Sequence, residues 1–324
     1  MQIPRPLQRL FDRFPLHTYD ANDLPERSQH LTSGHLPTLY VFSSEEDARL
    51  GAPSFNPTCL KWQASPLSPG TLLRLANLQF RVLPSTNHAS PTGSLPFLLP
   101  PRTSPTASPL PIPADKLLAY ARQHTSAQKQ QQPPLPPPPP ESTPSLPLRA
   151  QAYLSLITLS LRNAWLHALY LDPARTALLR RLYVDPCSTS AAVRAALLHQ
   201  LRRAAAEQIA ASSGKVVSTS PVSSADAIDE AAVYASAREA LAALASLLSE
   251  SGTGWFFGVE RPGEFDAALF SYTHLMMEWM GDGSAAEGRV PLGVMVSEAG
   301  SGELARHRER MLEVAWPEWD RRRR

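Results

Sequence analysis

The fold of this chain is decided by the stretch Asn87-His88-Ala89-Ser90-Pro91-Thr92-Gly93-Ser94-Leu95-Pro96-Phe97-Leu98-Leu99. Its first half consists of residues that favour turns, and its second half is a short apolar run. A proline in such a run is tolerated where a strand begins. We therefore expect a tight loop that leads straight into a buried strand over 94–99.

Two more strands are expected upstream of this loop. The run Thr38-Leu39-Tyr40-Val41-Phe42 is rich in β-forming residues, and residues 78–83 alternate apolar and polar side chains. Between them, Asn56 followed by Pro57 marks the start of a helix. Turn-forming residues over 65–70 predict a kink or a small insertion in that helix.

A short helix is expected downstream, over 114–124. The order strand, helix, strand, strand, helix is that of a thioredoxin-like domain, with a sheet covered on both sides. We place this domain at 37–126. A Gln- and Pro-rich linker follows at 127–147, either a solvated spacer or a ligand for a proline-recognising domain.

The part from 148 to 324 is expected to be all helical. Apolar residues recur there at helical spacing in four segments, which predicts amphipathic helices packed as a bundle. They are Ile157, Leu161, Ala164, Ala168 and Leu171; Val193, Leu197 and Leu201; Ala237, Leu241, Leu244 and Leu248; and Leu269, Tyr272, Met276 and Trp279. The third helix is expected to start at Ser223 and to end at Gly252.

Composition excludes several classes of protein. The chain has 324 residues, 43% of them hydrophobic, and a formal net charge of +2, which argues against disorder throughout and against a dominant nucleic-acid role. Its two cysteines, Cys59 and Cys187, indicate a reducing compartment. The best candidate for a membrane span, 152–171, contains Arg162 and Asn163. No segment is therefore expected to cross a bilayer, and membrane contact is expected to be peripheral or through a partner.

The two ends of the chain carry mixed apolar and basic residues. In the arm over 1–36, three arginines alternate with apolar residues, of which Leu10, Phe11 and Phe14 are the candidates for docking on a partner. A targeting peptide and a plain surface segment remain alternatives. At the other end, Trp316 and Trp319 precede the run 321–324 of arginines, which suits either an anionic membrane surface or a solvated tail.

Residues 56–63 and 87–97 resemble the metaxin family, the glutathione-S-transferase-like subunits of the fungal mitochondrial sorting and assembly machinery. The motif residues of the loop are Asn87, His88, Pro91, Gly93 and Pro96, and the short loop replaces a longer helix of true transferases. Pro96 matches the cis-proline that exposes a backbone edge to glutathione in this fold.

A second similar piece runs from 255 to 270 and resembles the buried capping box that starts a core helix in transferases and metaxins. Asp266 matches its aspartate, whereas Gly263 stands where a serine or threonine usually caps the helix.

The resemblance implies a glutathione-S-transferase-like fold, α/β plus all-α, and a binding role without cofactor, metal or catalysis. The implied place is the cytosolic face of the mitochondrial outer membrane. The implied partners are a β-barrel channel subunit, a second metaxin-like subunit and β-barrel precursor proteins.

Two other functions remain open. Cys59 lies at a helix start, where a thiol pKa falls, so it is either a packing residue or the nucleophile of a glutathione-dependent transferase or peroxidase. One observation argues against a nucleophilic role. Ile112-Pro113 is expected at the turn that anchors glutathione, but it has no hydroxyl side chain and Pro113 has no amide proton. The other alternative is an adaptor of this fold without a mitochondrial role.

Overall fold

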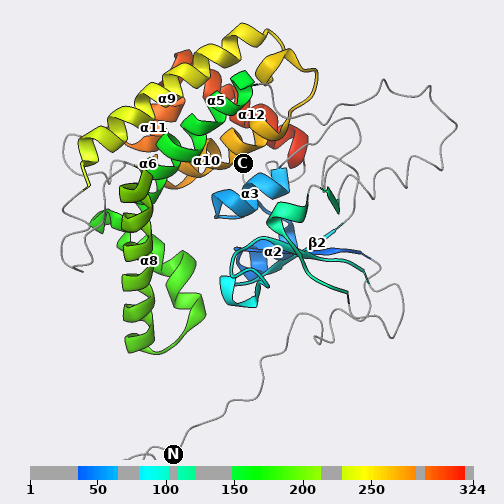
Figure 1. Cartoon of the computed structure of the whole chain (residues 1–324), viewed down its shortest axis with the longest axis vertical. Coiled ribbons are helices and arrows are strands. Elements are labelled where there is room, and N and C mark those ends of the chain that lie inside the picture. The colour runs from blue at the N-terminus through cyan, green and yellow to red at the C-terminus, as the bar shows by residue number, and fades with distance from the viewer. Residues whose placement is uncertain are drawn as a thin grey trace, which may run out of the picture.

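The computed structural model describes residues 36–64, 80–101, 109–117, 119–120, 148–212, 228–281 and 289–317. The N-terminal part holds a small sheet with helices against it, and the C-terminal part is helical, as Figure 1 shows.

A four-stranded mixed sheet forms the centre of the N-terminal part. Its order is β2-β1-β3-β4, with β1 parallel to β2 and antiparallel to β3, and β3 antiparallel to β4. The strands are β1 (Thr38–Val41), β2 (Arg81–Pro84), β3 (Phe97–Leu99) and β4 (Ile112–Pro113). The predictions of β1 and β3 are confirmed, although β3 begins after Pro96. β2 ends one residue later than expected, and residues 78–79 lie outside the described part.

Helices of the N-terminal part begin where local capping signals stand. They are α2 (Glu45–Leu50), α3 (Pro57–Ala64), the 3₁₀ turn η2 (Asn87–Ala89) and the helical residues 114–117 and 119–120. Asn56 Oδ1 accepts from the backbone N–H groups of Thr58 (3.0 Å) and Cys59 (3.2 Å), which confirms the predicted start of α3. The kink expected over 65–70 lies outside the described residues.

The C-terminal part has more helices than the four expected. Its first long segment consists of α5 (Leu148–Ser155), η3 (Leu156–Leu161), α6 (Arg162–Leu166) and η4 (His167–Leu171), of which η3 and η4 are π-helical. Next come η5 (Pro173–Arg175), α7 (Thr176–Leu179), η6 (Arg180–Val184), η7 (Asp185–Cys187) and α8 (Ala191–Ser212). The rest are α9 (Glu230–Ser251), η8 (Phe256–Gly258), α10 (Glu264–Trp279), α11 (Leu292–Glu298), η9 (Ala299–Gly302) and α12 (Glu303–Ala315).

The predicted end of α9 is confirmed, whereas its predicted start is wrong. Gly252 ends the helix in the left-handed conformation (φ 66°), as expected. The start expected at Ser223 is wrong, because α9 begins at Glu230 and its cap is Asp229, which accepts from the Ala232 N–H at 3.0 Å. Ser223 itself lies outside the described residues.

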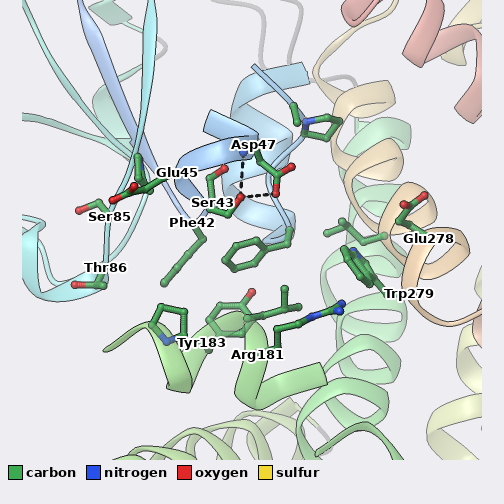
Figure 2. A pocket seen from close by; sticks show the side chains of 18 of the residues that line it. Phe42, Ser43, Glu45, Asp47, Ser85, Thr86, Arg181, Tyr183, Glu278 and Trp279 are labelled. Carbon is green, nitrogen blue, oxygen red and sulfur yellow. Dashed lines mark hydrogen bonds between the residues drawn. The ribbon is translucent and has the colours of Figure 1, made fainter. Parts of the chain in front are cut away.

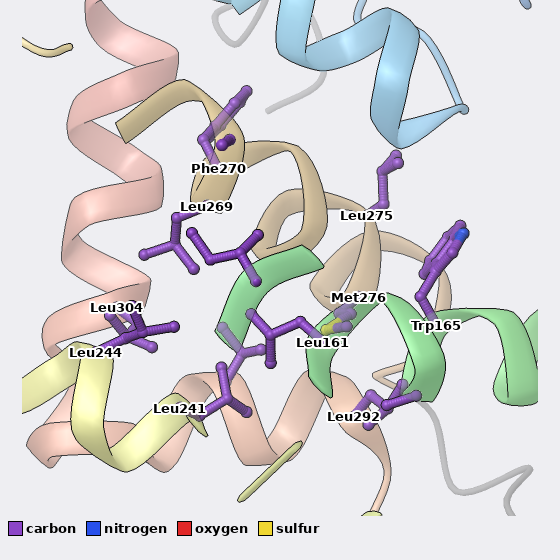
Figure 3. Packing of buried hydrophobic residues seen from close by; sticks show 14 of the residues in the cluster. Leu161, Trp165, Leu241, Leu244, Leu269, Phe270, Leu275, Met276, Leu292 and Leu304 are labelled. Carbon is purple, nitrogen blue, oxygen red and sulfur yellow. The ribbon is translucent and has the colours of Figure 1, made fainter. Parts of the chain in front are cut away.

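The core of the bundle surrounds α10, which is buried on nearly every side (Figure 3). Leu269 and Met276 of α10 are fully buried among leucines of α9, η3 and α12. Burying such apolar surface is the main favourable contribution to folding, about 25 cal/mol per Å². The segment Glu230–Gly258, which contains α9, is long and apolar enough to cross a membrane by length and composition, but half of its most apolar stretch is buried in the bundle. The expectation that no segment is long and apolar enough to cross a bilayer is therefore wrong by length and composition, while the burial is that of a core helix.

Polar contacts join the two parts of the molecule. Lys61 of α3 pairs with Glu264 of α10 (Nζ–Oε1 2.7 Å), where the two helices pack together. Trp316 donates from Nε1 to the Gly51 carbonyl at 3.0 Å. Trp316 is fully buried and stacks on Phe270, so both places expected for it, a membrane surface and a solvated tail, are wrong. Trp319 and the arginines over 321–324 lie outside the described residues.

Candidate functional site

The candidate site is a cleft of about 770 Å³ between the two parts, at the carboxyl ends of the parallel strands β1 and β2 (Figure 2). Its walls come from the segment after β1, from α2, from the residues after β2, from η6 and from the end of α10. Its volume is within the range of about 300–1,000 Å³ that small-molecule sites occupy.

Aromatic side chains from both parts line one side of the cleft. Tyr183 of η6 meets Phe42 and Phe55 edge-on, with ring centroids 5.1 Å and 5.2 Å away. The Asn56 amide donates to the Tyr183 hydroxyl at 3.1 Å, and burial raises the pKa of Tyr183 well above its usual value. The three rings therefore form a neutral, apolar floor.

Charged groups face each other across this floor. Glu45 and Asp47 of α2 lie on one wall, and neither forms an ion pair with any described residue. Asp47 accepts from the Ser44 hydroxyl at 2.8 Å. On the opposite wall Arg181 stacks on Trp279, with its guanidinium carbon 5.3 Å from the ring centroid.

Cys59 is not part of this cleft. It lies in the first turn of α3 with no exposed surface and packs in the core of the sheet domain. Burial raises the pKa of its thiol to about 12, and the opposing hydrogen bonds to Phe42 and Ser54 are weaker effects. The thiol is thus protonated at neutral pH, and no reagent reaches it without an opening of the domain.

The loop before β3 is closed by a side chain. The Leu95–Pro96 peptide bond is cis, as expected. Asn87 Oδ1 accepts from the Leu95 N–H at 3.1 Å, and Gly93 supplies the left-handed turn with φ 73°. Pro96 is buried, whereas His88 and Pro91 are exposed and contribute only to the course of the loop.

Asp266 fixes the start of α10, as the sequence predicts. It is 1% exposed, and its carboxylate accepts from the backbone N–H groups of Gly263 (2.7 Å) and Phe256 (3.2 Å). The structure adds a third partner, because His307 Nε2 of α12 lies 3.0 Å from Asp266 Oδ1. His307 is fully buried and no local sequence signal points to it.

Two sequence-family models match the chain. Residues 57–175 match the glutathione S-transferase N-terminal domain, and residues 237–311 match the glutathione S-transferase C-terminal domain. This is a glutathione-S-transferase-like fold.

Two solved structures with similarity to this glutathione-S-transferase-like chain are transferases of low sequence identity. A glutathione S-transferase of Ceriporiopsis subvermispora, solved in complex with glutathione, is 12% identical, with 86% of this chain and 97% of that chain covered and a TM-score of 0.45. Glutathione transferase F7 of Populus trichocarpa is also 12% identical, with 86% and 93% covered and a TM-score of 0.35. No curated protein gives a significant match.

One expectation about the glutathione-S-transferase-like site is wrong. Ile112-Pro113 is strand β4, paired with β3, and not the turn before the helix. A strand at the edge of a sheet accepts proline, because the missing N–H has no partner there. The helix that follows starts at residue 114, so its first turn contains Ala114 and Asp115 but no hydroxyl side chain.

The predicted site residues of this glutathione-S-transferase-like chain do not form one constellation. Asn87, Gly93 and Pro96 belong to the loop before β3, whereas Asp266 lies in the helical part. Leu10, Phe11 and Phe14 lie outside the described residues. Among the described residues, no three His, Cys, Asp or Glu side chains are close enough to bind a metal ion together.

Proposed function

We propose that this chain is a non-catalytic subunit of the sorting and assembly complex of the mitochondrial outer membrane. In this proposal it lies on the cytosolic face as a peripheral subunit. It helps to recognise β-barrel precursor proteins and to insert them into the membrane, together with a β-barrel channel subunit and a second metaxin-like subunit.

The observation that carries the proposal is the closure of the loop by Asn87. In transferases of this fold, the residue before the cis-proline uses its backbone to hold the peptide part of glutathione. Here the N–H of that residue, Leu95, already donates to Asn87 Oδ1 at 3.1 Å, and Leu95 is buried. A peptide ligand would have to replace this bond. It would gain little binding free energy there, because one hydrogen bond is exchanged for another. The residues that close the loop are also those that resemble metaxins.

The state of Cys59 supports a binding role as well. Nucleophilic cysteines need a low thiol pKa and access to the substrate. The pKa of Cys59 is instead raised to about 12 by burial, and the side chain is fully buried. In the glutathione-dependent alternative, Cys59 would have to become exposed and lose its proton.

Affinity purification from mitochondria in mild detergent tests the proposal. We expect a β-barrel channel subunit and a second metaxin-like subunit to copurify, and fractionation to find the chain with the outer membrane. A freely soluble pool without these partners would favour an adaptor outside mitochondria. Retention on a glutathione resin, with turnover that is lost in Cys59→Ala, would favour the transferase.

A further inference from the structure

We propose that the cleft between the two parts binds a peptide segment that presents a lysine or arginine side chain beside apolar side chains. The basic group would face Glu45 and Asp47, and the apolar side chains would lie on the floor of Phe42, Phe55 and Tyr183. This inference does not depend on the proposed function, because it concerns a surface of the chain itself.

The charges of the cleft favour a cationic ligand. Glu45 and Asp47 project from the first turn of α2 and have no ion-pair partner in the described part of the chain. A third carboxylate of the lining, Glu278, lies 3.8 Å from Arg308 and is thereby compensated. Arg181 is the counter-charge, but it lies on the other wall, stacked on Trp279. The α2 wall thus carries two carboxylates that, among the described residues, are balanced only by the partial positive charge of the helix start. It remains negative and attracts a basic group.

The apolar floor indicates that the ligand carries apolar side chains in addition to a basic group. Tyr183 meets Phe42 and Phe55 edge-on in a cleft of about 770 Å³, which is space for several side chains. Aromatic faces of this kind contribute to binding both apolar groups and cations. A peptide segment with both kinds of side chain fits the floor and the acidic wall together.

Glutathione fits this cleft less well than a basic peptide. It carries two carboxylates against one ammonium group, so its net charge has the same sign as the α2 wall. At the loop before β3, outside the lining of this cleft, the Leu95 N–H that would hold the backbone of glutathione already donates to Asn87 Oδ1 at 3.1 Å.

The test measures binding of labelled pentapeptides to the full-length purified chain by fluorescence anisotropy. The probe is acetyl-Gly-Leu-Lys-Phe-Gly-amide, and the matched peptides carry glutamine or glutamate in place of lysine. We expect the lysine peptide to bind most tightly and the glutamate peptide at least about tenfold more weakly, because it places like charges together. Raised salt should lower the affinity of the lysine peptide only.

A pair of neighbouring variants localises the binding. Glu45 lines the cleft, whereas Glu46, also in the first turn of α2, does not. Both substitutions, Glu45→Gln and Glu46→Gln, remove one charge from the same helix start, so their effects on folding should match. We expect Glu45→Gln to lower the affinity for the lysine peptide about two- to fivefold and Glu46→Gln to leave this affinity unchanged.

Three results would overturn the inference. They are equal affinity for the lysine and glutamate peptides, equal effects of the two variants, and no binding of the lysine peptide at millimolar concentration. Failure of the chain to copurify with mitochondrial partners would leave the inference intact, so the two proposals fail separately.

Discussion

Removal of the Asp266 carboxylate should destabilise the chain more than loss of an ordinary helix cap. A cap that is lost costs about 0.5–2 kcal/mol of unfolding free energy. Asp266→Ala, however, leaves three donors without an acceptor: the N–H groups of Gly263 and Phe256 and the ring of His307. A buried donor left unpaired costs about 1–3 kcal/mol. Because the site can relax in part, we expect a total loss of about 3–5 kcal/mol.

Urea unfolding of the purified chain, followed by circular dichroism, measures this loss. The midpoint should fall by about 1 M or more without a change in the slope. Asp229→Ala is the matched control, since Asp229 also caps a helix but accepts from one exposed N–H only, that of Ala232 at 3.0 Å. We expect the control to lose about 0.5–2 kcal/mol of unfolding free energy. If Asp266→Ala costs no more than Asp229→Ala, the reasoning from buried donors is refuted.

Three further predictions concern the thiols, alkaline pH and the arm. A disulfide-exchange reagent should modify the exposed Cys187 in the native chain and Cys59 only after denaturation; equal rates for both would show that the sheet domain opens readily. Burial raises the pKa of Cys59, Tyr170 and Tyr272 to about 12, above the ordinary values of 9.0 and 10.0, so these groups stabilise the fold most below pH 9. That stability should be lost as the pH rises towards 12, as urea midpoints between pH 8 and 11 can show, and a flat profile would contradict it. Deletion of residues 1–15 should leave the unfolding midpoint unchanged and abolish copurification with the complex; assembly that remains intact would show that the docking-arm hypothesis is wrong.

Features with a local signal could be predicted from the sequence. The run of β-forming residues gave β1, the Asn56-Pro57 pair marked the start of α3, and Asp266 was expected to be buried at a helix start. Each of these depends on residues a few positions apart. α2 also has such a signal, because Ser44 accepts from the Asp47 N–H and Gly51 ends the helix, yet six residues are too few to show a period.

Features that depend on distant partners could not be predicted. Tyr183 joins the floor of the cleft only because η6 packs beside the loop after β1. His307 and Trp316 lie in a segment rich in charged residues, and only the tertiary structure shows that they are buried against Asp266 and Phe270. The misplacement of Ile112-Pro113 has the same origin, since pairing with β3 decides its conformation.

Import of a radiolabelled β-barrel precursor into isolated mitochondria that lack this chain tests the central claim most directly. The comparison is between organelles that carry the wild-type chain, the Cys59→Ala variant or no chain at all. We expect integration of the β-barrel to be lost without the chain, import of a matrix precursor to continue, and Cys59→Ala to restore integration as fully as the wild type. Normal integration without the chain, or failure of a stably folded Cys59→Ala variant to restore it, would contradict the account of a non-catalytic assembly subunit.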